Sequence, residues 1–570
     1  MAAIEHRLAK WGGYLNSVPD RRSGWLVAGL LTLAAAAMVL LLLSPGKTVA
    51  TQHLWDIMTF IDAADRVNHG QVPNRDFHSP LGPLAYQLLG MGAALSGGFA
   101  GMMPASTALF VPLLLPLVIY ASLSRMPWLL ALLFGLYILI LSISPLFIGQ
   151  IQPGPSWGMF YNRWGWGLLS LLFLFVLPRR RPVGREALDM AAMASIWLLL
   201  FYSKTTFAVI GGVFLVALLW FPQARRAALG GIAGAAIAVL VVELFWGGTL
   251  GYIGDIRAAA AATGTVRGGV LGLFATLVNN VQGAYLFAAV LLIALLGRVR
   301  YDYLLVCLFM GAAGILLDRH NAQGPGILTF IPGALVAILA PRRGESDTAA
   351  APNLASILLA LAIAVPVMVV GAANVAFHFV TAARAPEGNL AVAGLQGIIA
   401  PDAPTSTPNQ PGALAAGGAA TDLCGGVDPV PNLQANQGEH PLSAAQTLAF
   451  VADGAALLQR TPQLAGKAFV PDLANPLNAL AGRQGPRGAE AFNDAEITFS
   501  KAVHRPAEQL FADADVLMIP KFAQKYATFD LMRQIYGPYW AANFELAARS
   551  PCWDGYRRIR RPAPAARPGT

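Results

Sequence analysis

Long apolar runs separated by short polar segments fill the sequence up to about residue 372. A membrane-spanning helix needs about 20 predominantly apolar residues, or fewer where the helix is broken or shielded by protein. The runs of suitable length are 25–43, 81–98, 105–124, 127–147, 165–178, 187–201, 204–220, 228–247, 284–297, 302–317, 325–340 and 354–372. Charged residues make up only 12% of the chain, about half the share in soluble proteins. The sequence therefore predicts an α-helical polytopic membrane protein.

Arginine clusters between the runs predict the orientation, because cytoplasmic loops of membrane proteins are rich in Lys and Arg. The clusters are Arg21 and Arg22, Arg179 to Arg181 with Arg185, Arg225 and Arg226, Arg298 and Arg300, and Arg342 and Arg343. With these clusters in the cytoplasm, the N-terminus is inside, and loop 44–80 and everything after 372 face outward. Because the basic residues form short clusters rather than one face, the net charge of +9 does not indicate a nucleic-acid partner.

The number of spans is predicted as 11 or 13. Three apolar runs lie between the outward loops 44–80 and 148–164, where an even number is required. Either one of these runs is re-entrant, or one of them contains two short helices.

The chain divides into a transmembrane domain over 1–380, a linker over 381–421 and a periplasmic α/β domain over 422–570. The linker is rich in Ala, Pro, Gly and Thr, which is typical of flexible segments. In the C-terminal domain, Ser443 and Gln446 form a capping box for a helix to Gln459. Strands are predicted over 467–473, 515–520 and 553–558, and a helix interrupted at Gly537-Pro538 is predicted over 528–549.

The three cysteines fall into two groups. Cys307 lies inside an apolar run, whereas Cys424 and Cys552 lie in the polar C-terminal part. If that part is outside the cytoplasm, Cys424 and Cys552 could form a disulfide. A pair of free thiols is the alternative.

The first outward loop, 44–80, concentrates ionisable residues beside the membrane, where they are costly unless paired, solvated or used. Apolar side chains recur there at helical spacing, at Ile57, Phe60, Ile61, Ala64 and Val67. They predict an amphipathic helix over 55–69 that lies along the membrane surface. On this prediction, Asp62, Asp65 and Arg66 belong to its solvated face.

The motifs of this loop resemble those of membrane glycosyltransferases with the C-type fold, a superfamily that includes protein O-mannosyltransferases and aminoarabinose transferases. There the loop opens with an acid, continues as an amphipathic helix, passes a Gly-x-x-Pro turn and closes on a Pro-Leu segment. Those features match Asp56, Gly70 to Pro73, and Asp76 to Leu84. Further similar segments are Tyr161 to Gly165, Ser203 to Thr206, and Ile331 to Gly333. One departure is Ile57, since many relatives carry a second acid directly after the first.

The resemblance implies an enzyme that moves a hexosyl or pentosyl group from a polyprenyl phosphate to an acceptor hydroxyl. A carboxylate takes the proton of the acceptor, and positive charge or a metal stabilises the departing phosphate. We expect Asp56 to be the general base and Asp76 to position the acceptor or help hold a metal. The expected contacts to the lipid phosphate are His78, Arg163, Lys204, Arg319 and His320. Helix capping by Asp56, a structural hydrogen bond from His78 and snorkelling of the basic residues at the interface are the alternatives.

A nucleotide cofactor is not expected, because the sequence has no P-loop and no glycine-rich dinucleotide motif. A divalent metal, with His78 and Asp76 as candidate ligands, is left open. The expected partners are the polyprenyl-phosphate donor, a glycan, lipid or protein acceptor, and the bilayer. The expected location is a bacterial inner membrane, with the site and the C-terminal domain facing the periplasm. The alternative function is a transporter or flippase for a lipid-linked glycan, which predicts charges near mid-membrane in repeated halves.

Overall fold

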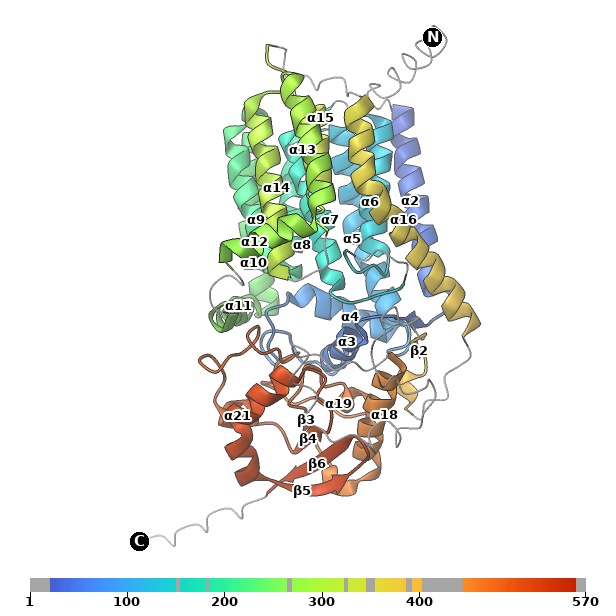
Figure 1. Cartoon of the computed structure of the whole chain (residues 1–570), viewed down its shortest axis with the longest axis vertical. Helices are drawn as coiled ribbons and strands as arrows, with labels where there is room; N and C mark the ends of the chain where they lie inside the picture. Colours follow the sequence, from blue (N-terminus) through green and yellow to red (C-terminus); the bar gives the residue numbers. More distant parts are fainter. Residues whose placement is uncertain are drawn as a thin grey trace.

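The computed structural model describes residues 21–149, 154–180, 184–263, 269–321, 326–344, 354–385, 392–401 and 444–559. An elongated bundle of helices occupies one end of the molecule, and the C-terminal domain occupies the other (Figure 1). The N-terminal end of α2 lies at the end of the bundle that is away from the C-terminal domain (Figure 1). The start of α2, which carries the first predicted arginine cluster, and the C-terminal domain therefore lie at opposite ends of the bundle. The orientation of the bundle in the membrane stays a prediction.

The bundle contains helices whose outer faces are apolar. Its members are α2 (Arg21–Leu43), α5 (Met102–Arg125), α6 (Trp128–Ile143), α7 (Phe160–Phe173), α8 (Glu186–Ser203), α9 (Thr205–Ala217), α10 (Pro222–Trp246), α12 (Gly269–Asn279), α13 (Val281–Leu296), α14 (Tyr301–Asn321), α15 (Phe330–Leu339) and α16 (Leu354–Arg384). Large apolar side chains point outward from it, with Phe245 89% and Leu244 83% exposed. Such a surface is compatible with lipid rather than water.

Within the described residues, six helices are long and apolar enough to cross a membrane, or seven if the pair α12 and α13, bent by 84°, is one span. The predicted run 81–98 becomes α4 (Pro83–Leu95), whose 13 residues cover only about 20 Å. Because a bilayer core is about 30 Å thick, α4 is too short to cross it. By the same measure α6, with 16 residues, is also too short, so helix length does not single out α4 among the three runs. The total of 11 or 13 spans stays a prediction.

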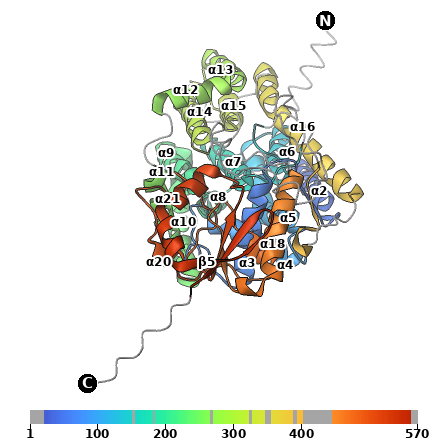
Figure 2. The same cartoon turned by 60° about the horizontal axis from the view of Figure 1, so that its bottom comes forward.

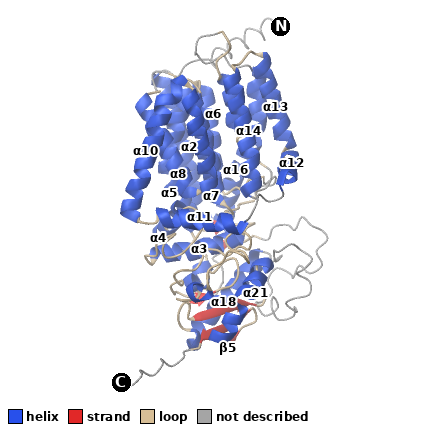
Figure 3. Ribbon diagram, turned by 90° about the vertical axis from the view of Figure 1, so that its left-hand side faces the viewer, coloured by secondary structure: helices blue, strands red, loops and turns tan. Residues whose placement is uncertain are grey.

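A layer of short helices separates the bundle from the C-terminal domain: α3 (Leu54–Asn68), α4 and α11 (Thr249–Thr263), as Figure 3 shows. The predicted amphipathic helix over 55–69 is confirmed as α3, and its apolar residues Ile57, Phe60 and Ile61 are buried. The helix ends in a Schellman turn, in which Gln71 N–H donates to the Arg66 carbonyl and Gly70 N–H to that of Val67. Gly70 has φ 77°, the left-handed conformation that this turn requires.

The opposite face of α3 was wrongly predicted to be solvated. Asp62 and Arg66 are each only 1% exposed and form an ion pair of 2.7 Å. Arg66 Nη1 also donates to the Pro486 carbonyl at 2.5 Å, so this face lies beneath the C-terminal domain. Of the three residues, Asp65 comes closest to the predicted solvent exposure, because it is only half-buried and pairs with His69. A pattern within one helix could not reveal that a domain more than 400 residues away covers its polar side.

The C-terminal domain is α/β as predicted, with the strand order β3-β4-β6-β5. Its strands are β3 (Ala468–Phe469), β4 (Val516–Pro520), β5 (Phe544–Arg549) and β6 (Trp553–Arg558), and only the β3–β4 pair is parallel. Its helices are α18 (Ala444–Arg460), α19 (Leu477–Leu480), α20 (Ala507–Leu510) and α21 (Tyr526–Asn543). Viewed from this end, α18 and α21 flank the sheet, with α3 behind it (Figure 2). The predicted helix over 528–549 differs, because it runs through Pro538 and stops at Asn543, where β5 begins.

Part of the predicted linker is ordered. Residues 392–401 contain strand β2 (Ile398–Ile399), which pairs in parallel with β1 (Thr48–Val49) at the start of the first outward loop. Most of the remaining linker lies outside the described residues, as do Ser443 and Cys424. Cys552 is disulfide-bonded, whereas Cys307 is free and buried.

Candidate active site

Asp56 lies in the first turn of α3, where the first outward loop meets the segment before α7. Its Oδ2 accepts the backbone N–H of Met159 at 2.8 Å. Two non-glycine residues with left-handed backbone conformations lie beside it: His53 with φ 53°, directly before α3, and Met159 with φ 45°. Such conformations persist only where the surroundings impose them, and they are common at functional sites. Asp56 is therefore held in place by the backbone of a second segment.

Lys204 faces the same place from the junction between α8 and α9. Its Nζ donates to Asn162 Oδ1 at 2.9 Å and lies 4.9 Å from the centre of the Tyr161 ring. Asp56 is close enough to Lys204 to act on it electrostatically. The structure thus brings together one predicted catalytic acid and one predicted phosphate-binding cation, which are about 150 residues apart in the sequence.

The end of the first outward loop is packed tightly against this junction. Gly82 N–H donates to the Ser203 carbonyl at 3.1 Å, and a Cβ at Gly82 would overlap the backbone of Tyr202 and Ser203. Only glycine allows this close approach. The contact fixes the position of Lys204 relative to the loop that carries Asp56.

A second group of polar side chains surrounds Asp255 of α11. Asp255 Oδ1 meets His78 Nδ1 at 2.9 Å and Arg505 Nη2 at 3.4 Å. Its Oδ2 accepts hydrogen bonds from Asn74 Nδ2 at 2.9 Å and from the Ser79 backbone N–H at 3.0 Å. The carboxylate therefore joins the first outward loop, α11 and the C-terminal domain at one point.

Glu490 extends this group from the C-terminal domain. Its Oε1 lies 3.0 Å from Arg505 Nε, and its side chain is 13% exposed. Burial is the main cause that raises the pKa of Glu490, with the nearby Asp255 acting in the same direction, whereas Arg505 lowers it. Together these groups line a cavity of about 430 Å³ between α11 and the C-terminal domain.

Asp76 and His78 were predicted as candidate ligands of one metal ion, but their side chains have different surroundings in the structure. His78 lines the cavity beside Asp255. Asp76 Oδ2 accepts the backbone N–H of Val72 at 2.8 Å, and its Oδ1 lies 3.5 Å from Arg487 Nη1. Asp76 thus shapes the turn that follows α3 and faces the C-terminal domain.

The other predicted phosphate contacts are dispersed. Arg163 is 1% exposed and donates to the carbonyls of Ser144 and Leu146, which makes it a link between α7 and the segment after α6. Arg319 packs against Gly272 of α12, and His320 is exposed at the end of α14. Asn321, the next residue, accepts a hydrogen bond of 3.5 Å from Thr206, so this end of α14 lies beside the start of α9.

Sequence reasoning missed Asp255, Glu490 and Arg505. Asp255 and Glu490 stand alone among apolar and small residues in the sequence, and no motif singles them out. The one available signal was that a lone acid follows glycine in the outward segment 248–283, at Gly254-Asp255.

Among the described residues, no group of three or more His, Cys, Asp or Glu is placed to hold a metal ion. Beside His78, the guanidinium of Arg505 lies between the carboxylates of Asp255 and Glu490 and pairs with both. The donor set there consequently suits hydrogen bonding better than cation coordination.

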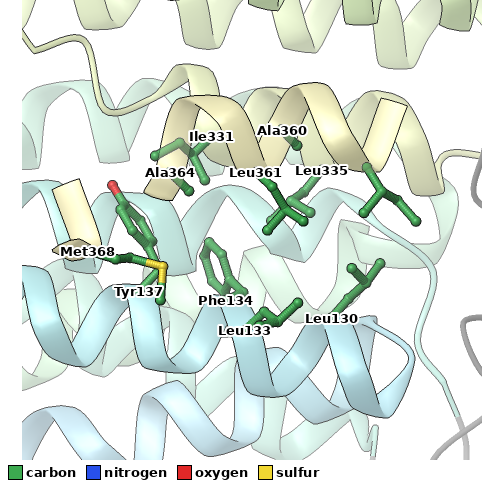
Figure 4. A pocket seen from close by; sticks show the side chains of 11 residues that line it. Leu130, Leu133, Phe134, Tyr137, Ile331, Leu335, Ala360, Leu361, Ala364 and Met368 are labelled. Atoms are coloured by element: carbon green, nitrogen blue, oxygen red, sulfur yellow. The ribbon is translucent and has the colours of Figure 1, made fainter. Parts of the chain in front are cut away.

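A smaller cavity of about 40 Å³ lies inside the bundle (Figure 4). Leu130, Phe134 and Tyr137 of α6 face Ile331 of α15 and Leu361 and Met368 of α16 across it (Figure 4). Its lining is almost wholly hydrocarbon, so it offers no group for chemistry.

No family model matches the sequence, and no curated protein matches it. Two solved structures resemble it, both of ArnT from Cupriavidus metallidurans. The structure bound to undecaprenyl phosphate aligns with 94% of this chain and 98% of the ArnT chain, with a TM-score of 0.44 and 10% identity. The apo structure aligns with 93% and 98%, with a TM-score of 0.44 and 12% identity. ArnT is an aminoarabinose transferase with the C-type fold, the superfamily that the sequence motifs resemble. At this identity and TM-score the likeness assigns neither an activity nor a substrate to this chain.

Proposed function

We propose that the protein is a glycosyltransferase that moves a sugar from a polyprenyl-phosphate donor to an acceptor hydroxyl on the outer face of the membrane. The observation that carries this proposal is that Asp56 and Lys204 both contact the short segment 159–162 at the boundary between the apolar bundle and the C-terminal domain. An acid and a cation at that depth match a donor whose tail is in lipid and whose phosphate lies at the interface.

The chemistry assigned to the two residues is complementary. The acceptor oxygen attacks the anomeric carbon while the bond between that carbon and the phosphate oxygen breaks. Asp56 takes the proton of the attacking hydroxyl. The bonding electrons leave with the polyprenyl phosphate, whose additional negative charge is stabilised by Lys204. Asn162 and the Tyr161 ring hold the Lys204 ammonium group in position.

The alternative, a transporter or flippase, lacks a comparable observation. Its expected signature is charge near mid-membrane in two related halves. Asp56, Asp255 and Lys204 instead lie where the bundle meets the layer of α3, α4 and α11.

The test is glycosyl transfer by the full-length protein in nanodiscs with a panel of polyprenyl-phosphate sugars, comparing wild type with Asp56→Asn. We expect the substitution to lower transfer by about 10²- to 10⁴-fold, the usual contribution of a general base. Asp65→Asn is the matched control, because Asp65 is on the same helix but pairs with His69. Full transfer by a folded Asp56→Asn variant would assign the base elsewhere. In closed proteoliposomes, donor movement across the bilayer without transfer would favour the flippase.

A further inference from the structure

The cavity beside Asp255 has walls from three distant parts of the chain. His78 comes from the first outward loop, Gly254 and Asp255 from α11, and Glu490 and Arg505 from the C-terminal domain. Its volume of about 430 Å³ lies in the range of small-molecule sites, roughly 300–1,000 Å³. The cavity therefore exists only because the C-terminal domain docks onto α11 and the loop.

The lining combines polar and apolar side chains. Glu490 and Arg505 supply an acceptor and donors, while Phe499, Met532 and Tyr536 supply apolar surface. A saccharide ring has both kinds of surface, because its hydroxyl groups lie around the edge and its C–H groups on the faces. Carboxylates and guanidinium groups bind hydroxyls through several hydrogen bonds at once, and an aromatic side chain packs on the apolar face.

The polar groups are fixed before any ligand arrives. Asn74 and Ser79 hold one oxygen of Asp255, and Tyr536 Oη donates to the Arg505 backbone carbonyl at 2.9 Å. A pre-ordered site binds with less loss of conformational entropy.

The charge of the lining selects the ligand further. Two carboxylates, Asp255 and Glu490, face the single guanidinium of Arg505. Together these three groups carry no surplus of positive charge. A carboxylate or phosphate ligand would thus be repelled or at best not attracted.

The cavity wall is also connected to the centre formed by Asp56 and Lys204. Asp56, Tyr86 and Asp494 are all close enough to act electrostatically on Tyr161, and Asp494 follows the cavity residue Asn493. On the cavity side, Tyr86 Oη lies 2.7 Å from Ser79 Oγ, whose backbone N–H binds Asp255. Ser79 and Tyr86 thus link the cavity wall to the residues around Tyr161, whose ring lies against Lys204.

We propose that this cavity is the acceptor subsite and takes a neutral saccharide unit, whose hydroxyls bind Glu490 and Arg505, which Asp255 helps to hold in place. The role of this saccharide as acceptor rests on the proposed function. Its binding in the cavity does not, because binding requires no catalysis. The proposal narrows the acceptor from a glycan, lipid or protein to a glycan that presents an uncharged sugar.

The test measures equilibrium binding of methyl glycosides of neutral hexoses and pentoses to the full-length protein in nanodiscs at pH 8, without donor. Methyl glucuronide is the matched anionic probe. We expect at least one neutral glycoside to bind, and to bind at least about tenfold more tightly than the glucuronide. Equal binding of both probes, or no binding of any neutral glycoside, would overturn the proposal.

Two substitutions at one position show whether binding occurs in this cavity. A Cβ at Gly254 meets no atom within 4 Å, so Gly254→Phe projects a ring into the open space. We expect it to weaken binding of the neutral glycoside at least about tenfold, whereas Gly254→Ala leaves it nearly unchanged. If Gly254→Phe does not fold, Ala258→Leu on the next turn of α11 fills the same cavity. Unchanged binding in the filled variant would place the saccharide elsewhere.

Donor cleavage on the same wild-type preparation separates the two proposals. Glycoside binding without any cleavage of the polyprenyl-phosphate panel would refute the proposed function and keep the cavity as a saccharide site. Cleavage that is sensitive to Asp56→Asn, together with no glycoside binding, would keep the function and refute the subsite.

Discussion

The cavity beside Asp255 depends most on that residue, because both of its carboxylate oxygens accept hydrogen bonds. Oδ1 meets His78 and Arg505, and Oδ2 meets Asn74 and the Ser79 N–H. In Asp255→Asn only one of the two atoms can accept a hydrogen bond. Whichever way the amide turns, its N–H group faces at least one donor, either Arg505 or the pair formed by Asn74 and the Ser79 N–H. We expect a loss of about 1–3 kcal/mol in stability, measured as a lower midpoint of thermal unfolding.

The control for that substitution is Asp65→Asn. Asp65 forms a single pair with His69, whose side chain is 41% exposed, at a spacing of four residues on α3. Such pairs contribute roughly 0.5 kcal/mol or less. A drop of the same size in both variants would mean that Asp255 has no special role in joining the three parts.

Buried carboxyl groups in the C-terminal domain predict the pH dependence of its stability. Burial raises the pKa of Asp472 to about 6, although three backbone N–H groups donate to it. The folded state then binds a proton at a higher pH than the unfolded state does, so stability rises as the pH falls from 7 through about 6. The gain is complete near the ordinary pKa of an aspartate and reaches roughly 3 kcal/mol at most.

Thermal unfolding of the full-length protein between pH 7.5 and 4.5 checks this sign. We expect the midpoint to rise on acidification through this window, with Glu490 contributing in the same direction. A midpoint that falls steadily from pH 7 would show that the ionised form of Asp472 is the one the fold stabilises.

At the scale of elements, α11 contains one tightly packed glycine, Gly251, and one glycine with open space beside it, Gly254. A Cβ at Gly251 would overlap the Asn74 carbonyl oxygen, whereas one at Gly254 meets nothing within 4 Å. Gly251→Ala should push α11 away from the first outward loop and lower the unfolding midpoint. Gly254→Ala should be neutral or stabilising by up to about 1 kcal/mol, because alanine favours helix. Equal effects of the two changes would contradict this close packing of α11.

Elements with a strong local pattern could be predicted from the sequence, and those defined by pairing could not. The apolar spacing of Ile57, Phe60 and Ile61 correctly predicted α3, and the continuous apolar run before Pro520 correctly predicted β4. Segment 544–549 contains leucine and alanines and was predicted as helix, but its backbone pairs with β6 instead. Register with another strand is information that a single segment does not contain.

The candidate site shows the same division. Asp56 and Lys204 could be identified because each belongs to a recognisable local motif. Asp255, Glu490 and Arg505 could not, since their partners are separated by up to 250 residues and meet only when the outer domain docks. For the same reason Asp62 and Arg66 were placed in solvent although both are buried.

At the scale of the whole molecule, the C-terminal domain docks onto the first outward loop through three backbone hydrogen bonds, which are called the backbone match below. Gly488 N–H donates to the Asp76 carbonyl, His78 N–H to that of Ala489, and Ala491 N–H to that of His78. Beside this match, Arg66 bonds the Pro486 carbonyl and Gln71 Nε2 bonds that of Gly485 at 2.8 Å. The two parts are thus joined by main-chain contacts that hold the cavity walls together.

Arg66 should therefore control how often this junction opens. In Arg66→Met the Asp62 carboxylate loses its ion-pair partner inside the interface, and the Pro486 carbonyl loses a donor. Removing one member of a buried pair costs about 3–5 kcal/mol, because the remaining charge stays desolvated. We expect the amides of Gly488 and Ala491 to exchange with solvent at least about tenfold faster, measured by hydrogen exchange. His69→Gln, at the exposed end of the same helix, should leave these amides unchanged. If Arg66→Met lowers the unfolding midpoint without faster exchange at Gly488 and Ala491, the ion pair stabilises α3 itself, and docking depends on the backbone match alone.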